Sequence, residues 1–190
     1  IFIAGAGVQW LRDRMKFFKK APETEKIVKS LKDNNNIYLV PAFTGLGAPY
    51  WDANARGVLS GITRDTSPKE IIRATIEAVG YQTYDLFEAM KHDGLRPKIV
   101  KVDGGMVMNN WFSQFLSDIV NVKVLRPKVQ ETTALGAAFM AGLQIGIYKS
   151  LKDISKNWHL DKKFSPKMKN TLRNKLLKGW SAAIKKTLTN

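Results

Sequence analysis

A strand, a glycine bend and a helix follow one another in the middle of this sequence, and this succession constrains the fold most. Residues 98–103 (KIVKVD) form a short segment rich in β-branched apolar residues, which predicts a strand. Gly104 and Gly105 come next, and apolar residues then recur at helical spacing from about Asn109 to Ile119. Because such a unit buries its apolar faces by packing helices on a sheet, we expect an α/β fold.

Neighbouring segments continue the alternation of strands and helices. Residues 122–125 are predicted to form another strand, and residues 133–147 a helix whose alanine and glycine faces press into the core. Upstream, short strands are expected at 37–42 and 58–63, joined by a turn-rich loop over 44–57 that its aromatic residues hold in place. The alternation favours one compact unit with a largely parallel central region and helices around it.

A long helix is predicted to start at Ser67. Pro68 stands at its first position, and Glu70 follows the cap by three residues, which completes a capping box. Apolar residues keep a mostly helical spacing until Gly94. Gly80 interrupts this helix at a cost of roughly 1 kcal/mol relative to alanine, so we expect a neighbouring element to pack closely against it.

The C-terminal region is basic and amphipathic. A helix is predicted over about residues 165–188, docked on the domain through one apolar face while its lysines face water. The residues of that face recur at four-residue steps: Met168, Leu172, Leu176, Trp180, Ile184 and Leu188. We favour this docked arrangement over a membrane-binding or nucleic-acid-binding helix.

Composition sets limits on function. A hydrophobic content of 44% and a charged content of 25% in 190 residues are typical of one folded domain. The absence of cysteine excludes disulfides and thiolate catalysis, and no apolar run approaches the roughly 20 residues of a membrane span, so a cytoplasmic location is expected. The chain starts at Ile1 inside an apolar stretch, which indicates a fragment or a processed product.

The net charge of +15 leaves open a nucleic-acid partner or an anionic substrate. The lysines are spread along the chain without interleaved stacking aromatics, so a solvated basic surface is the preferred interpretation and no nucleic-acid partner is expected.

Two glycine bends are candidate phosphate-binding sites. Gly104 and Gly105 end a strand, and Asn109 follows with an amide that can offer a donor and an acceptor to a purine. Residues 4–7 (AGAG) form a second small-residue turn, with Gln9 in the helix behind it. Either bend alone is equally consistent with a purely conformational use of glycine.

A longer pattern is more specific. It comprises residues 57–62 (GVLSGI), seven residues, then Glu70 and Ile71, two residues, then residues 74–77 (ATIE). This spacing resembles the second signature of the FGGY carbohydrate kinases, a family that includes glycerol, xylulose and gluconate kinases. Four further segments are similar to glycerol kinases in particular, namely residues 4–13, 41–57, 102–110 and 131–143.

The resemblance implies an actin-like, ribonuclease-H-like ATPase domain with a central mixed sheet flanked by helices. Residues 1–190 would be the second, C-terminal nucleotide-binding domain, with its opening strands and phosphate hairpin before Ile1. The parent enzyme, expected to be a homo-oligomer, would use ATP and Mg²⁺ to phosphorylate glycerol held mainly by its N-terminal domain. That domain would supply an aspartate base, so no catalytic or metal-binding residue is assigned to this chain.

By position in the motifs, the resemblance implies nucleotide-binding roles for Gly5, Gln9, Gly105 and Asn109. Asp103 is expected to bond local backbone N–H groups rather than a metal ion. Two alternatives remain open: a kinase of the same family for another polyol or sugar, and a basic module that keeps the fold but binds nucleic acid.

Overall fold

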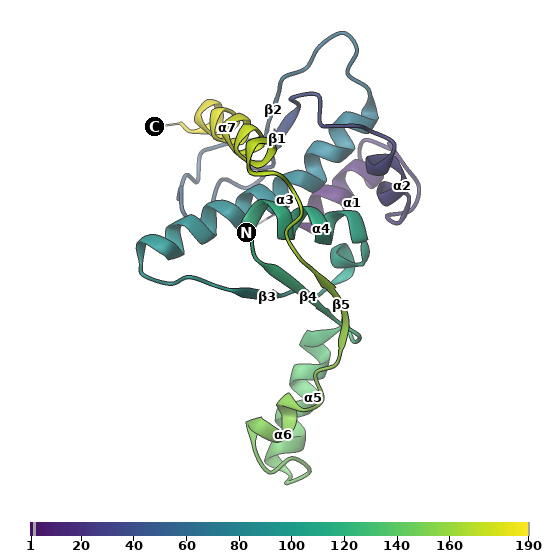
Figure 1. Ribbon diagram of the computed structural model, residues 1–190. Coiled ribbons are helices and arrows are strands. Elements are labelled where there is room, and N and C mark those ends of the chain that lie inside the picture. Colours follow the sequence, from purple (N-terminus) through teal and green to yellow (C-terminus); the bar gives the residue numbers. More distant parts are fainter. Residues whose placement is uncertain (2, 190) are drawn as a thin grey trace.

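The computed structural model describes residue 1 and residues 3–189, which form helices and short strands in alternation (Figure 1). The helices are α1 (Gly5–Asp13), α2 (Glu23–Lys29), α3 (Pro68–His92), α4 (Asn110–Val120), α5 (Thr132–Gln144), α6 (Leu151–Ser155), α7 (Asn170–Thr187) and the 3-10 helix η1 (Gly105–Met108). The strands are β1 (Tyr38–Val40), β2 (Val58–Ser60), β3 (Ile99–Lys101), β4 (Lys123–Pro127) and β5 (Leu160–Phe164).

The strands divide into two small sheets. β3 and β4 run parallel, and β5 pairs antiparallel with β4. β1 and β2 form a separate antiparallel pair. The predicted mixed α/β architecture is therefore confirmed, but the expected largely parallel arrangement is not, because two of the three strand pairings described are antiparallel. β5 was not predicted, because its lysines resemble the basic segment that follows them.

α3 is the central helix, and it packs against α4 and β1. Its capping box is present: Ser67 N–H donates to Glu70 Oε2 at 2.9 Å, and Lys69 N–H donates to Ser67 Oγ at 3.2 Å. A methyl group at Gly80 would lie 2.9 Å from a ring carbon of Phe115 on α4. The close approach predicted at this glycine is thus confirmed.

Glu77, in the middle of α3, is fully buried and anchors a polar network. Arg73 Nε lies 2.8 Å from its carboxylate, Tyr81 Oη donates to it at 3.0 Å, and Asn34 Nδ2 donates at 3.2 Å. Burial raises the pKa of Glu77, and the charge and hydrogen bond of Arg73 oppose that rise. This glutamate of the family signature therefore serves the interior of the fold.

The terminal helix begins later than predicted, at Asn170 instead of residue 165. The carboxylate of Asp118 accepts hydrogen bonds from Lys167 N–H at 2.6 Å and Met168 N–H at 3.2 Å, which holds the preceding segment in a non-helical turn. The predicted docking face is confirmed at its centre, where Leu176, Trp180 and Ile184 are buried. Within the described residues, no helix is both long enough and apolar enough to cross a bilayer.

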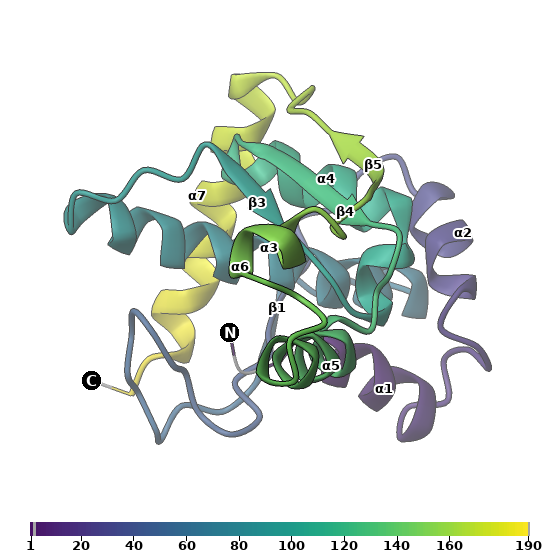
Figure 2. The same ribbon diagram turned by 90° about the horizontal axis from the view of Figure 1, so that it is seen from below.

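α5 is helical as predicted, but it does not press into the core. Figure 1 shows α5 and α6 projecting from the rest of the fold, and in Figure 2, which views the molecule from that side, they lie in front of it. Most α5 side chains are exposed, Met140 to 51%, and Gly142 is its one buried residue. The close packing at Gly142 comes from a residue just after α5, since a methyl group at Gly142 would lie 2.8 Å from the Tyr148 ring.

The loop between β1 and β2 is held by a carboxylate as well as by one of its aromatic residues. Asp52 is buried and accepts N–H bonds from Asn54 at 3.0 Å, Ala55 at 2.9 Å and Thr189 at 2.8 Å. Tyr50 packs against the core as predicted, whereas Trp51 is 74% exposed and does not anchor the loop.

Candidate functional site

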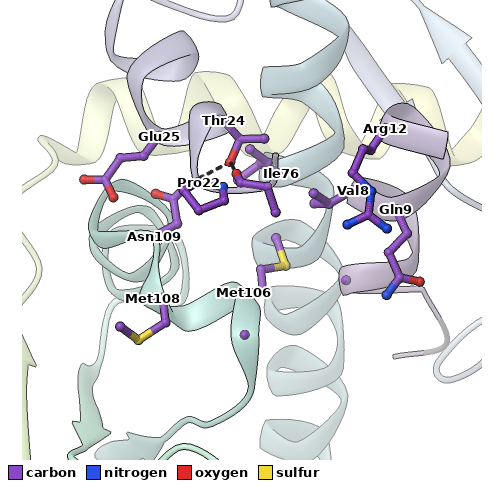
Figure 3. A pocket seen from close by; sticks show the side chains of 13 residues that line it. Val8, Gln9, Arg12, Pro22, Thr24, Glu25, Ile76, Met106, Met108 and Asn109 are labelled. Carbon is purple, nitrogen blue, oxygen red and sulfur yellow. Dashed lines mark hydrogen bonds between the residues drawn. The ribbon is translucent and has the colours of Figure 1, made fainter. Parts of the chain in front are cut away.

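A pocket of about 330 Å³ contains all four residues predicted to bind nucleotide (Figure 3). It lies between α1, α2, the bend before α4, and Ile76 of α3. Its lining residues are Gly5, Val8, Gln9, Arg12, Ala21, Pro22, Thr24, Glu25, Ile76, Gly105, Met106, Met108 and Asn109. The fold thus brings together two glycine bends that are 100 residues apart in the sequence.

The α1 wall presents Gly5, Val8, Gln9 and Arg12, which share one face because they are spaced by three or four residues. Ala4 at the N-cap supplies no side-chain hydrogen bond, so the first-turn N–H groups of α1 lack a side-chain cap. Among residues 1 and 3–189, no heavy atom of a neighbouring segment lies within 4 Å of the position that a Gly5 side chain would occupy. Exposed N–H groups and the positive end of a helix suit an anion.

The second bend presents bare backbone in the same way. Gly104 has φ of 84° and ψ of 171°, a conformation that is essentially restricted to glycine. Gly105 has open space for 4 Å around its absent side chain and opens η1, which carries Met106 and Met108 into the pocket wall. A ligand can therefore approach the main chain at both bends.

Asn109 has a more restricted role than the sequence suggested. Its Oδ1 accepts Phe112 N–H at 2.9 Å and so caps α4, while its Nδ2 donates to Thr24 Oγ1 at 3.4 Å. Thr24 Oγ1 in turn donates to the Ala21 carbonyl at 2.7 Å. The cap uses one lone pair of Oδ1 and Thr24 takes one N–H of Nδ2, so Asn109 keeps one further acceptor site and one further N–H, and its contact with a purine stays a prediction.

α2 forms a wall that the sequence analysis missed. Glu25 lines the pocket, and its Oε2 accepts Asn110 N–H at 3.1 Å while Lys29 pairs with Oε1. Burial acts to raise the pKa of Glu25, but the hydrogen bonds from Lys29 and Asn110 lower it below its ordinary value. The signal for this helix was Pro22 followed by acidic residues, a common helix start.

Arg12 was also missed, although it stands one turn after Gln9 on the same face of α1. Its guanidinium pairs with the neighbouring carboxylate of Asp13, and this hydrogen bond lowers the pKa of Asp13. Helical spacing from Gln9 was the signal that could have identified it.

The remaining candidates lie outside the pocket. Asp103 is exposed, and within residues 1 and 3–189 its carboxylate accepts no hydrogen bond, so the predicted bonding to local N–H groups is wrong. His92 and His159 are exposed. No cluster of three or more histidine, aspartate or glutamate side chains suited to a metal ion occurs in the described part of the chain.

Comparison with known proteins identifies close sequence relatives. Residues 1–145 match the C-terminal domain of the FGGY family of carbohydrate kinases. Glycerol kinase 1 of Pseudomonas aeruginosa is 54% identical over 98% of this chain, and a glycerol kinase of Clostridium botulinum is 51% identical over 99%. The chain spans 38% of the length of each of these two relatives.

Solved structures agree with these sequence relationships. A Plasmodium falciparum glycerol kinase with ADP matches 98% of the chain and is itself covered to 37%, with 35% identity and a TM-score of 0.85. A ligand-bound xylulose kinase from Lactobacillus acidophilus matches 95% of the chain and is covered to 37%, with 25% identity and a TM-score of 0.77. The predicted actin-like, ribonuclease-H-like ATPase fold is confirmed, and the chain belongs to the FGGY family of carbohydrate kinases.

Proposed function

We propose that residues 1–190 are the C-terminal, nucleotide-binding domain of a cytoplasmic glycerol kinase. The enzyme transfers the γ-phosphoryl group of ATP to glycerol and yields glycerol 3-phosphate and ADP. The observation that carries this proposal is the single pocket in which the bare main chain of Gly5 and Gly105 meets the side chains of Gln9 and Asn109. The glycerol kinase relatives, one of them solved with ADP, support it.

The lining residues fit a nucleotide in chemical type. The two glycines give unobstructed backbone for phosphate oxygens, and the N-terminal end of α1 favours their negative charge. Apolar side chains, among them Val8 and Met106, offer the kind of surface on which a purine packs. ATP supplies the phosphoryl group, and this chain holds and orients the nucleotide, which is most of what such a transfer requires from a protein.

Other parts of the reaction are placed outside this chain. The base that accepts the glycerol proton and the main glycerol contacts belong, in this proposal, to the N-terminal domain. Mg²⁺ is likewise assigned no ligand in this chain. The chain by itself is accordingly proposed to be inactive as a kinase.

The test is a substrate comparison with the full-length enzyme. Release of ADP is measured with glycerol, xylulose and gluconate as acceptors, each at saturating ATP. Glycerol is expected to give the highest kcat/KM. Activity on a sugar together with no activity on glycerol would refute the glycerol assignment while leaving the nucleotide pocket intact.

A further inference from the structure

Arg12 is the one cationic side chain among the described residues that line the pocket. It stands seven residues after Gly5 on the same face of α1, a rise of about 10 Å along the helix. Side chains on a helix lean toward its N-terminus, and Figure 3 shows Arg12 beside Val8 and Gln9. Arg12 therefore lies on the pocket wall, about two turns along α1 from the bare backbone at Gly5.

The edge of this guanidinium is already occupied. Arg12 Nε donates to Asp13 Oδ1 at 2.7 Å, and Nη2 donates to Oδ2 at 2.9 Å. This bidentate pair is exposed, with side-chain exposures of 36% for Arg12 and 54% for Asp13, so its own contribution to stability is small. The pair nevertheless fixes the orientation of the guanidinium plane, and it occupies neither of the two flat faces of the guanidinium.

The other walls provide what a flat aromatic ligand needs. Pro22 of the α2 wall and Met106 of η1 supply apolar contact, and the one acidic lining residue, Glu25, already pairs with Lys29 and Asn110. A guanidinium face attracts an aromatic ring, and arginine planes are common partners of unstacked bases. If the phosphates of a bound nucleotide lie at the two glycines, its nucleobase lies farther along α1, toward Arg12.

We propose that Arg12 stacks on the nucleobase of the bound nucleotide, with Asp13 holding its edge. This inference rests on the nucleotide-binding role proposed above. It assigns recognition of the base to a residue outside the glycine bends. The competing explanation is a solvated surface ion pair that happens to border the pocket.

The test compares Arg12→Lys with Arg12→Gln. Lysine keeps the charge and loses the planar face, so stacking predicts that both variants weaken ADP binding by a similar factor, about two- to thirtyfold. Arg14→Gln is the matched control, because Arg14 is an exposed arginine that does not line the pocket. Dissociation constants for ADP and adenosine are measured by calorimetry on residues 1–190, and the KM for ATP is measured on the full-length enzyme.

Adenosine separates the base from the phosphates. Equal weakening for ADP and adenosine in both Arg12 variants, with Arg14→Gln unchanged, supports stacking. The stacking is refuted if Arg12→Lys binds with wild-type affinity, or if the variants lose affinity for ADP but not for adenosine. Either result would mean that Arg12 acts only through its charge. If the wild-type chain and the full-length enzyme bind no nucleotide, the proposed function is refuted together with the stacking. If the wild-type protein binds nucleotide and both Arg12 variants bind it with the same affinity, only the stacking is refuted.

Discussion

Gly105→Val is expected to weaken nucleotide binding without unfolding the domain. The space around the absent Gly105 side chain is open for 4 Å, and Gly105 lacks the positive φ that would strain another residue. A valine there therefore meets solvent in the free protein and the ligand in the complex. Inserting such a group into a packed contact costs about 1–3 kcal/mol, so ADP affinity should fall about 5- to 150-fold.

Calorimetric titration with ADP measures the affinity, and thermal unfolding measures the stability. Gly136→Val is the matched control, since Gly136 also has open space around it and lies on α5, away from the pocket. Gly104→Val is the contrasting variant, because its φ of 84° predicts a loss of stability by strain. Unchanged ADP affinity in a folded Gly105→Val protein would show that the ligand does not approach this backbone.

Three further variants test the interior. Gly80→Val should lower the free energy of unfolding by about 1–3 kcal/mol in urea denaturation, because its side chain would overlap Phe115; an unchanged value would mean that α3 and α4 separate easily. Arg73→Met should lower the free energy of unfolding by about 3–5 kcal/mol in the same assay, because Glu77 stays buried without its cation. The double variant Arg73→Met/Glu77→Gln should lower it by less. Burial raises the pKa of Asp85 from 3.8 to about 6, so the free energy of unfolding should fall by about 3 kcal/mol as pH rises from about 4 to above 6. Asp85→Asn should remove this part of the pH dependence, and a variant profile identical to that of the wild type would refute the pKa shift.

Local signals in the sequence identified most of the secondary structure correctly. The capping box at Ser67 needs only neighbouring residues, and its helix begins as predicted. β3 and α4 were likewise specified by local β-branched composition and helical spacing. The start of α7 failed by the same criterion, because Asp118, about 50 residues earlier, holds Lys167 and Met168 in a turn. No local pattern encodes that contact.

The candidate site was predicted in part. Motif positions indicated Gly5, Gln9, Gly105 and Asn109, and the fold places them around one pocket, while their binding roles stay a prediction. The α2 wall was missed because seven residues of helix give a weak periodic signal. The cap that Asn109 forms on α4 was not predicted, because the pairing of its oxygen with Phe112 N–H depends on side-chain geometry.

The sequence by itself determined the α/β class, the family and the positions of the two glycine bends, because these depend on residues close together in the chain. Tertiary structure decided what those bends do together. Only packing of α1 and α2 against α3 brings Gly5 within one pocket of Gly105, and only the α1 face places Arg12 on its wall. A binding site is a property of distances between remote segments, and periodicity carries information about near neighbours alone.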